Sequence, residues 1–127
     1  MNVVLVQGVL ARAPEEWVVG GGDRIVGFDL TVRPEGAPPD TVPIRWESPL
    51  AWAMSLAVGE EVLVTGRVRR RFFRAGGGTQ SRTEVLAEVV VRVKAGRRGR
   101  RAVDDAVVAA LAAVGIEARA ADAEAGS

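Results

Sequence analysis

The segment 62–73, with the sequence VLVTGRVRRRFF, shows the alternation of an extended strand with two different faces. Successive side chains of a strand point to opposite sides, so the even-numbered residues from Val62 to Val68 form one small, apolar face. The opposite face carries guanidinium groups and ends in an aromatic ring: Arg67, Arg69, Arg71 and Phe73. Guanidinium groups bind phosphates through a fixed fork of donors, and a ring offers a face on which a base stacks. Because basic residues also protect strand edges from aggregation, this segment alone leaves nucleic-acid contact and edge protection as alternatives.

The composition excludes most catalytic chemistry. The chain has 127 residues, enough for one domain with its own hydrophobic core. It contains no Cys, His or Tyr, so it lacks disulfides, the commonest zinc ligands and every Ser-His or Cys-His nucleophile pair. Three adjacent acidic pairs are interpreted as solvated charge at turns or a helix start: Glu15-Glu16, Glu60-Glu61 and Asp104-Asp105. We therefore expect no enzymatic activity, no metal or organic cofactor and no small-molecule substrate.

Positive charge is concentrated in one part of the sequence. The net charge is only +1, from 17 basic and 16 acidic residues. Between Arg67 and Arg101, however, 12 basic residues stand against two acidic ones, Glu84 and Glu88. A local excess of this kind attracts a polyanion.

The remaining pattern is mainly that of β-strands. The apolar run VVLVQGVLA near the N-terminus lacks a basic start and a cleavage site, so it predicts a strand, and we expect a cytoplasmic protein without membrane contact. Strands are predicted over 3–11, 24–33, 41–46, 62–73 and 81–93. Within 24–33, the even-numbered face is expected to point to the core. Glycine triplets and the loop 34–40 separate these strands.

Two helical segments complete the predicted order. Ser48 and Pro49 predict the start of a helix that runs to Gly59, between the third and fourth strands. Residues 96–101 (GRRGRR) are interpreted as a basic linker, followed over 103–114 by a short helix or a frayed segment. This order predicts an all-β fold with one short helix, a five-stranded Greek-key barrel of the OB type. The barrel is expected over 1–95 and the linker and tail over 96–127.

The order and spacing of several residues resemble the bacterial single-stranded DNA-binding proteins. The similarity begins at Met1-Asn2, passes through Pro14-Glu15 and Phe28, and includes the strand segment 64–69 (VTGRVR). It extends over roughly residues 1–94. The resemblance implies an OB-fold that assembles through its first strand into a dimer or tetramer. It also implies binding of single-stranded DNA without strong sequence preference, during replication, recombination or repair.

The resemblance further implies which residues contact DNA. Phe73 matches a stacking Trp before the hairpin tip, and Trp46 matches a stacking Phe at the end of the third strand, with burial in the core as its alternative. Arg33 ends the second strand beside a loop that contacts DNA in the family. The other candidates lie on the fourth strand or near the hairpin tip: Arg67, Arg69, Arg71, Arg74 and Arg82. Trp17, at a predicted turn, remains without an assigned role.

The chain also departs from the family pattern. Asp40 stands where the family has a Trp, and the loop 34–40 carries no aromatic residue. We therefore expect weaker binding than in the family's main members. The end of the sequence, EARAADAEAGS, lacks the family's acidic and hydrophobic tip, so recruitment of enzymes through the last residues is not expected. Three alternatives remain open: a primosomal-type OB-fold protein acting mainly through protein contacts, a binder of single-stranded RNA, and a purely structural module.

Overall fold

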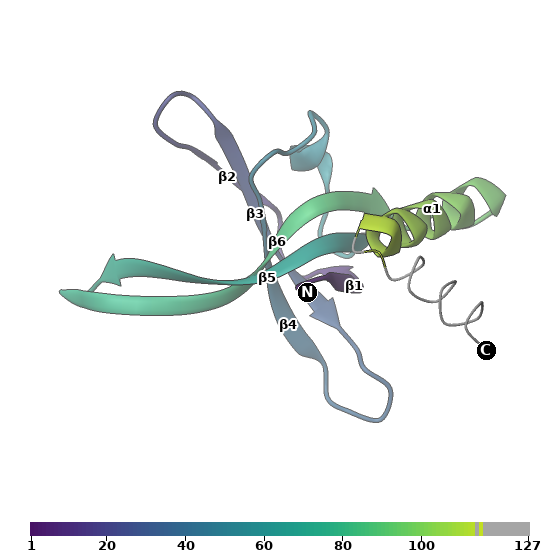
Figure 1. Cartoon of the computed structure of the whole chain (residues 1–127), viewed down its shortest axis with the longest axis horizontal. Helices are drawn as coiled ribbons and strands as arrows, with labels where there is room; N and C mark the ends of the chain where they lie inside the picture. The colour runs from purple at the N-terminus through teal and green to yellow at the C-terminus, as the bar shows by residue number, and fades with distance from the viewer. Residues whose placement is uncertain (114, 116–127) are drawn as a thin grey trace.

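The structure, a computed structural model, describes residues 1–113 and 115. It contains six strands and one α-helix (Figure 1). In chain order these are β1 (Val4–Leu10), β2 (Glu15–Val18), β3 (Arg24–Val32), β4 (Asp40–Trp46), β5 (Glu61–Ala75), β6 (Gly78–Arg92) and α1 (Arg97–Ala113). Each of the five predicted strands is present, with ends that differ by a few residues from the expected ones.

Five strands close into a barrel. Their order is β1-β5-β6-β4-β3, and pairing of Val9 and Leu10 in β1 with Thr31 and Leu30 in β3 closes the ring. The pairing of β4 with β6 is parallel, and the other pairings are antiparallel. This confirms the five-stranded Greek-key barrel of an OB-fold. The short strand β2, which pairs with the start of β3, was not predicted.

The core is supplied by the predicted apolar faces. Val26 and Leu30 of β3 and Val62 and Val64 of β5 are completely buried. This confirms the even-numbered face of β3 and the first part of that of β5, whereas Val68, beyond the bulge, is 42% exposed. Full burial of one such side chain stabilises the fold by about 1.5–3 kcal/mol. The rest of the same cluster comes from β3, β1, β4, β6 and the segment after β4: Phe28, Leu10, Ile44, Trp46, Ala53, Leu56, Val85, Ala87 and Val90.

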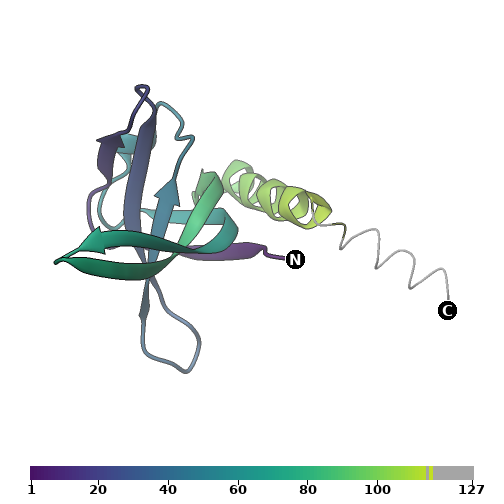
Figure 2. The same cartoon turned by 60° about the vertical axis from the view of Figure 1, so that its left-hand side comes forward.

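The β5–β6 hairpin extends far beyond the barrel (Figures 1 and 2). Its register shifts at Thr65/Gly66, where Glu88 is the extra residue of a β-bulge in β6. Gly66 permits a very close approach of the two strands at this point, since a Cβ atom there would lie 2.0 Å from the carbonyl oxygen of Leu86. Bulges increase local twist, so this one redirects the hairpin away from the closed barrel.

The prediction of a helix between the third and fourth strands is wrong. The structure has only a 3₁₀ turn over Ala53–Ser55, and Leu56 after it is already extended. Ala53 and Leu56 are both buried in the core cluster. A segment of about ten residues forms a helix only when tertiary packing favours it, because helix nucleation is costly. Here the packing of these two side chains across the end of the barrel favours the shorter turn.

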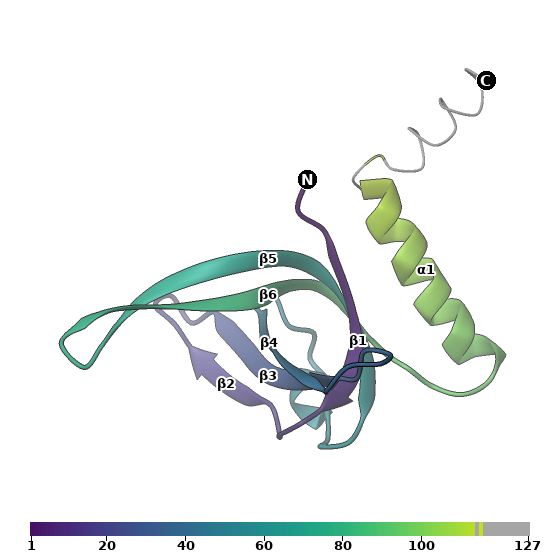
Figure 3. The ribbon, with the colours of Figure 1, turned by 90° about the horizontal axis from the view of Figure 1, so that it is seen from below.

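The C-terminal helix is longer than predicted. α1 begins at Arg97, so the segment interpreted as a basic linker forms its first turns, and Asp104 and Asp105 lie in its middle rather than at its start. Arginine is a good helix former, which explains the extension. Gly99 packs so closely on the preceding loop that a Cβ atom would lie 1.9 Å from the carbonyl oxygen of Lys94. The helix packs against β5 and β6, at the opposite end of the barrel from the hairpin tip (Figure 3).

Within the described part of the chain, no helix combines the length and the hydropathy needed to cross a bilayer. We expected that the last residues, 117–127, do not recruit enzymes, and these residues lie outside the described part of the chain.

The bulge generates a stability prediction. We expect Gly66→Ala to lower the free energy of unfolding by about 1–3 kcal/mol or more, because the added methyl group overlaps backbone atoms that have no room to move. Gly78→Ala is the matched control, since a Cβ atom there meets nothing within 4 Å. Urea unfolding followed by circular dichroism measures both. Equal stability of the two variants would contradict the close approach at Gly66.

Candidate nucleic-acid interface

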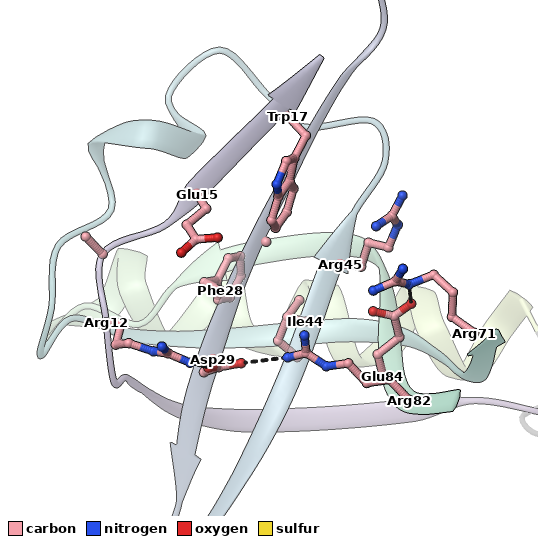
Figure 4. A pocket seen from close by; sticks show the side chains of 12 residues that line it. Arg12, Glu15, Trp17, Phe28, Asp29, Ile44, Arg45, Arg71, Arg82 and Glu84 are labelled. Carbon is pink, nitrogen blue, oxygen red and sulfur yellow. Dashed lines mark hydrogen bonds and ion pairs between the residues drawn. The ribbon is translucent and has the colours of Figure 1, made fainter. Parts of the chain in front are cut away.

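A cavity lies on the outer surface of the barrel, at the base of the β5–β6 hairpin (Figure 4). Asp29 and Arg45 point outward there because their strand neighbours Phe28 and Ile44 point into the core. The cavity combines one exposed aromatic ring with four guanidinium groups and three carboxylates. The side chains that define it are Arg12, Glu15, Trp17, Asp29, Arg45, Arg71, Arg82 and Glu84.

Asp29 holds two of the arginines. Its carboxylate is almost buried, with the residue 8% exposed. Arg12 donates a hydrogen bond to Oδ2, and Nη2 of Arg82 lies 3.4 Å from Oδ1. The hydrogen bond to Asp29 and the charge of Asp29 raise the pKa of Arg12. Two arginines from distant parts of the chain are thereby fixed at one side of the cavity.

Glu84 holds two more arginines from the facing strand. It is 4% exposed, and the hairpin register pairs it directly with Arg69. Nε of Arg71 donates a 2.9 Å hydrogen bond to Glu84 Oε1, and Nη2 of Arg69 lies 3.5 Å from the same oxygen. A buried carboxylate with two guanidinium groups is a rigid anchor, because its removal leaves Arg71 without its carboxylate partner and takes one of two such partners from Arg69.

Glu47 extends this network at the end of β4. Its Oε2 atom lies 3.4 Å from Nη2 of Arg69 and 3.3 Å from Nε of Arg45. Burial by itself would raise the pKa of Glu47, but the hydrogen bonds and charges of Arg45 and Arg69 outweigh it and the pKa is lowered. The carboxylate is therefore held in its ionised form beside the two arginines.

The structure places three of the predicted basic residues in ion pairs, and the three others lie outside these ion pairs. Arg69, Arg71 and Arg82 all belong to the two carboxylate clusters. Three residues are exposed and make no ion pair within the described residues: Arg33 after the end of β3, Arg67 on the same face of β5 as Arg69, and Arg74 near the hairpin tip.

Trp46 is a core residue, which corrects the expected stacking role. It is 2% exposed and packs edge-on against Trp52, with the ring centroids 5.6 Å apart. Its pairing with Val26, a residue of the core face, directs the side chain into the barrel. A buried ring has no free face for a base, so the core alternative holds for this residue.

Phe73 lies on the cavity side of the hairpin but is partly covered. The side chain is half-buried, and the guanidinium of Arg71 lies over its ring, 5.1 Å from the centroid. Its neighbour Phe72 is 66% exposed on the opposite face of the same strand. The stacking role of Phe73 stays a prediction, because the face covered by Arg71 is closed to a base in this arrangement.

Sequence reasoning missed Trp17. It lies on β2, is 45% exposed, and its ring reaches over Gly27 of β3. A Cβ atom on Gly27 would lie 2.6 Å from a carbon of the indole. The available signal was Gly27 itself, since a glycine inside an alternating strand often marks the close approach of another group.

The carboxylate partners of the arginines were missed as well. In the sequence, Glu84 stands out only as one of two negative charges between Arg67 and Arg101. The signal was the turn at Gly76 and Gly77, because a hairpin centred there places residue 84 opposite residue 69. Part of the positive charge of the arginines on β5 is therefore neutralised by a carboxylate of the neighbouring strand β6.

Solved structures show which known proteins this fold resembles. The sequence matches no protein-family model and no curated protein at a significant level. The fold, however, is similar to that of the single-stranded DNA-binding protein from Thermus aquaticus, with a TM-score of 0.63 and 26% identity over 76% of this chain, both for a deletion mutant and for the wild type. The chain is an SSB-like OB-fold protein.

The same SSB-like fold occurs in a second organism. The Plasmodium falciparum SSB in complex with single-stranded DNA matches with a TM-score of 0.58 and 20% identity over 68% of this chain and 86% of its own. The chain spans less than half of the Thermus aquaticus structures, 43% and 42% of their lengths. These similarities establish the fold of this SSB-like chain, and its binding properties are a separate question.

The Glu84 cluster generates a second prediction. We expect Glu84→Gln to lower the free energy of unfolding by about 1.5–3 kcal/mol, because Arg69 and Arg71 lose a charged acceptor in a nearly dry position. The control is Glu88→Gln, an exposed position on the same strand, which should change stability by less than about 0.5 kcal/mol. Denaturant unfolding measures both. A neutral Glu84→Gln would show that the cluster does not stabilise the hairpin.

Proposed function

We propose that the protein binds single-stranded DNA along the outer face of the barrel, without strong sequence preference and without catalysis. The observation that carries this proposal is the gathering of Arg12, Arg45, Arg71 and Arg82 with an exposed tryptophan around one cavity of an SSB-like fold. Guanidinium groups supply forked donors for phosphates, and aromatic rings supply stacking faces for bases. Both features support a single-stranded ligand whose bases are free to stack.

In the proposed mode, the DNA backbone follows β5 from the barrel to the hairpin tip. Phosphates exchange with the internal carboxylates at Arg69 and Arg71 and bind directly to the exposed Arg67. Arg74, on the other face of β5, is reached where the DNA passes the hairpin tip. Arg33 and Arg82 flank this path, and Phe73 stacks on a base once a phosphate draws Arg71 from its ring. Because carboxylates already compensate the central arginines, affinity is expected to be moderate and strongly dependent on salt.

We further propose that the protein assembles as a homodimer or homotetramer through β1. Within the described residues, Val4–Gly8 of this strand pair only with β5, because β3 reaches no farther than Val9. Leu5, in the middle of the unpaired edge, is 40% exposed. An open edge of this kind accepts a strand from a second copy. The proposed biological role is protection or organisation of single strands during replication, recombination or repair, in the cytoplasm where that DNA is found.

The two faces of the hairpin allow a matched experiment. We expect the protein to bind a fluorescently labelled oligo-dT, with affinity that falls steeply as salt is raised. Arg69→Ala/Phe73→Ala should weaken binding about tenfold or more, because it removes a phosphate contact and a stacking ring from the cavity side. The control Arg70→Ala/Phe72→Ala removes the same two residue types from the opposite face and should retain most of the affinity. Fluorescence anisotropy at low and high salt measures all three proteins.

Two outcomes would contradict this proposal. Absence of binding at low salt would exclude the DNA-binding role and favour action through protein contacts. Equal losses in the two double variants would show that the cavity side is not the binding face. A parallel titration with an oligo-U RNA of the same length decides whether the ligand class includes RNA.

A further inference from the structure

Four of the chain's six aromatic rings are buried or have another group over one face. The chain contains three Trp and three Phe residues, all in the described part. Phe28 and Trp46 are buried in the core, at 5% and 2% exposed. Trp52 packs against Trp46 on one side and carries the guanidinium of Arg92 over its ring, 4.8 Å from the centroid. The fourth is Phe73, which is half-buried and covered by an arginine.

The two remaining rings differ in position. Phe72 is exposed, but it lies on the face of the hairpin opposite Arg71 and the cavity. Trp17 is 45% exposed and lines the cavity itself. Among the described residues, no cation lies over the indole of Trp17 and no other ring packs on it. Trp17 is therefore the exposed ring that faces the arginine cluster.

The indole is also held in place before any ligand arrives. β2 pairs with β3 from Glu15 to Val18, which fixes the backbone on which Trp17 stands. Gly27 leaves room for the edge of the ring against the strand. Figure 4 shows Trp17 at the rim of the cavity, with Arg45 and Arg71 to one side of it. A side chain held in this way loses little conformational entropy when a ligand binds.

We propose that Trp17 is a stacking platform for one nucleobase of single-stranded DNA, with the base seated over the cavity and its phosphates directed to Arg45 and Arg71. This inference rests on the proposed DNA-binding function and adds a ligand-contacting residue to it. The position supplies a ring that the loop 34–40 lacks, since that loop contains no aromatic residue. Stacking on a fixed ring is tolerant of sequence, because every base has a π-face.

The test separates stacking from phosphate contact. We expect Trp17→Leu to weaken binding to oligo-dT by about 5- to 150-fold, the range that corresponds to loss of one stacked base. The same variant should bind an abasic deoxyribose-phosphate oligomer of equal length, at low salt, as well as the wild type does. Trp17→Tyr, which keeps a ring, should recover most of the affinity for oligo-dT. Trp52→Phe is the control, because its ring is already covered.

Tryptophan fluorescence gives an independent readout. Oligo-dT should quench the emission of the wild type and of Trp52→Phe, while Trp17→Leu should lose most of the quenching at saturating DNA. Equal losses of affinity on oligo-dT and on the abasic oligomer would overturn the stacking role and leave Trp17 with a structural one.

Unchanged binding and quenching in Trp17→Leu would overturn the inference alone, provided that Arg69→Ala/Phe73→Ala still weakens binding. Absence of DNA binding by the wild type would overturn the inference and the proposed function together.

Discussion

Pairing across the β5–β6 hairpin is the constraint on which the outer face depends. Gly76 and Gly77 both adopt positive φ, at 59° and 79°, and close the hairpin tightly. This turn places Glu84 opposite Arg69 and within reach of Arg71. A shift by one residue would move Glu84 to the opposite face and leave these arginines without their common acceptor. The turn lies far from the barrel, but it therefore determines which charges are paired on the surface at the base of the hairpin.

The paired carboxylates change the physical character of that surface. Unpaired arginines in a row would repel one another and sample many rotamers. Glu84 and Asp29, both almost buried, instead hold four guanidinium groups in defined positions, and three of the four line one cavity. A polyanion must exchange with these carboxylates to reach the arginines, which lowers affinity but directs the ligand to positions already arranged for it. Single-stranded DNA binding of moderate strength is the function that we propose for this arrangement.

The fold was predictable to a large extent because strands of a small barrel alternate strictly. The apolar faces of β3 and β5 were assigned residue by residue, and the barrel topology followed from the order of strands and turns. The segment after β4 was not predictable in the same way, since Ala53 and Leu56 suit a helix as well as a 3₁₀ turn and only the barrel end selects between them. The helical start of α1 at Arg97 was likewise hidden by a composition typical of linkers.

The candidate site was predicted only in part. The arginines and the strand that carries them could be identified from the sequence, because charge and alternation are properties of the sequence. Their partners were not, because Asp29 and Arg12 or Arg82 are distant in the chain and meet only when β3, β6 and the segment after β1 are assembled. For the same reason, the sequence did not show that Trp46 is buried and that Trp17 is exposed at the cavity. Sequence by itself determined an all-β barrel with a basic strand, whereas tertiary pairing decided which rings are buried and which guanidinium groups are already bound, because both depend on contacts between residues far apart in the chain.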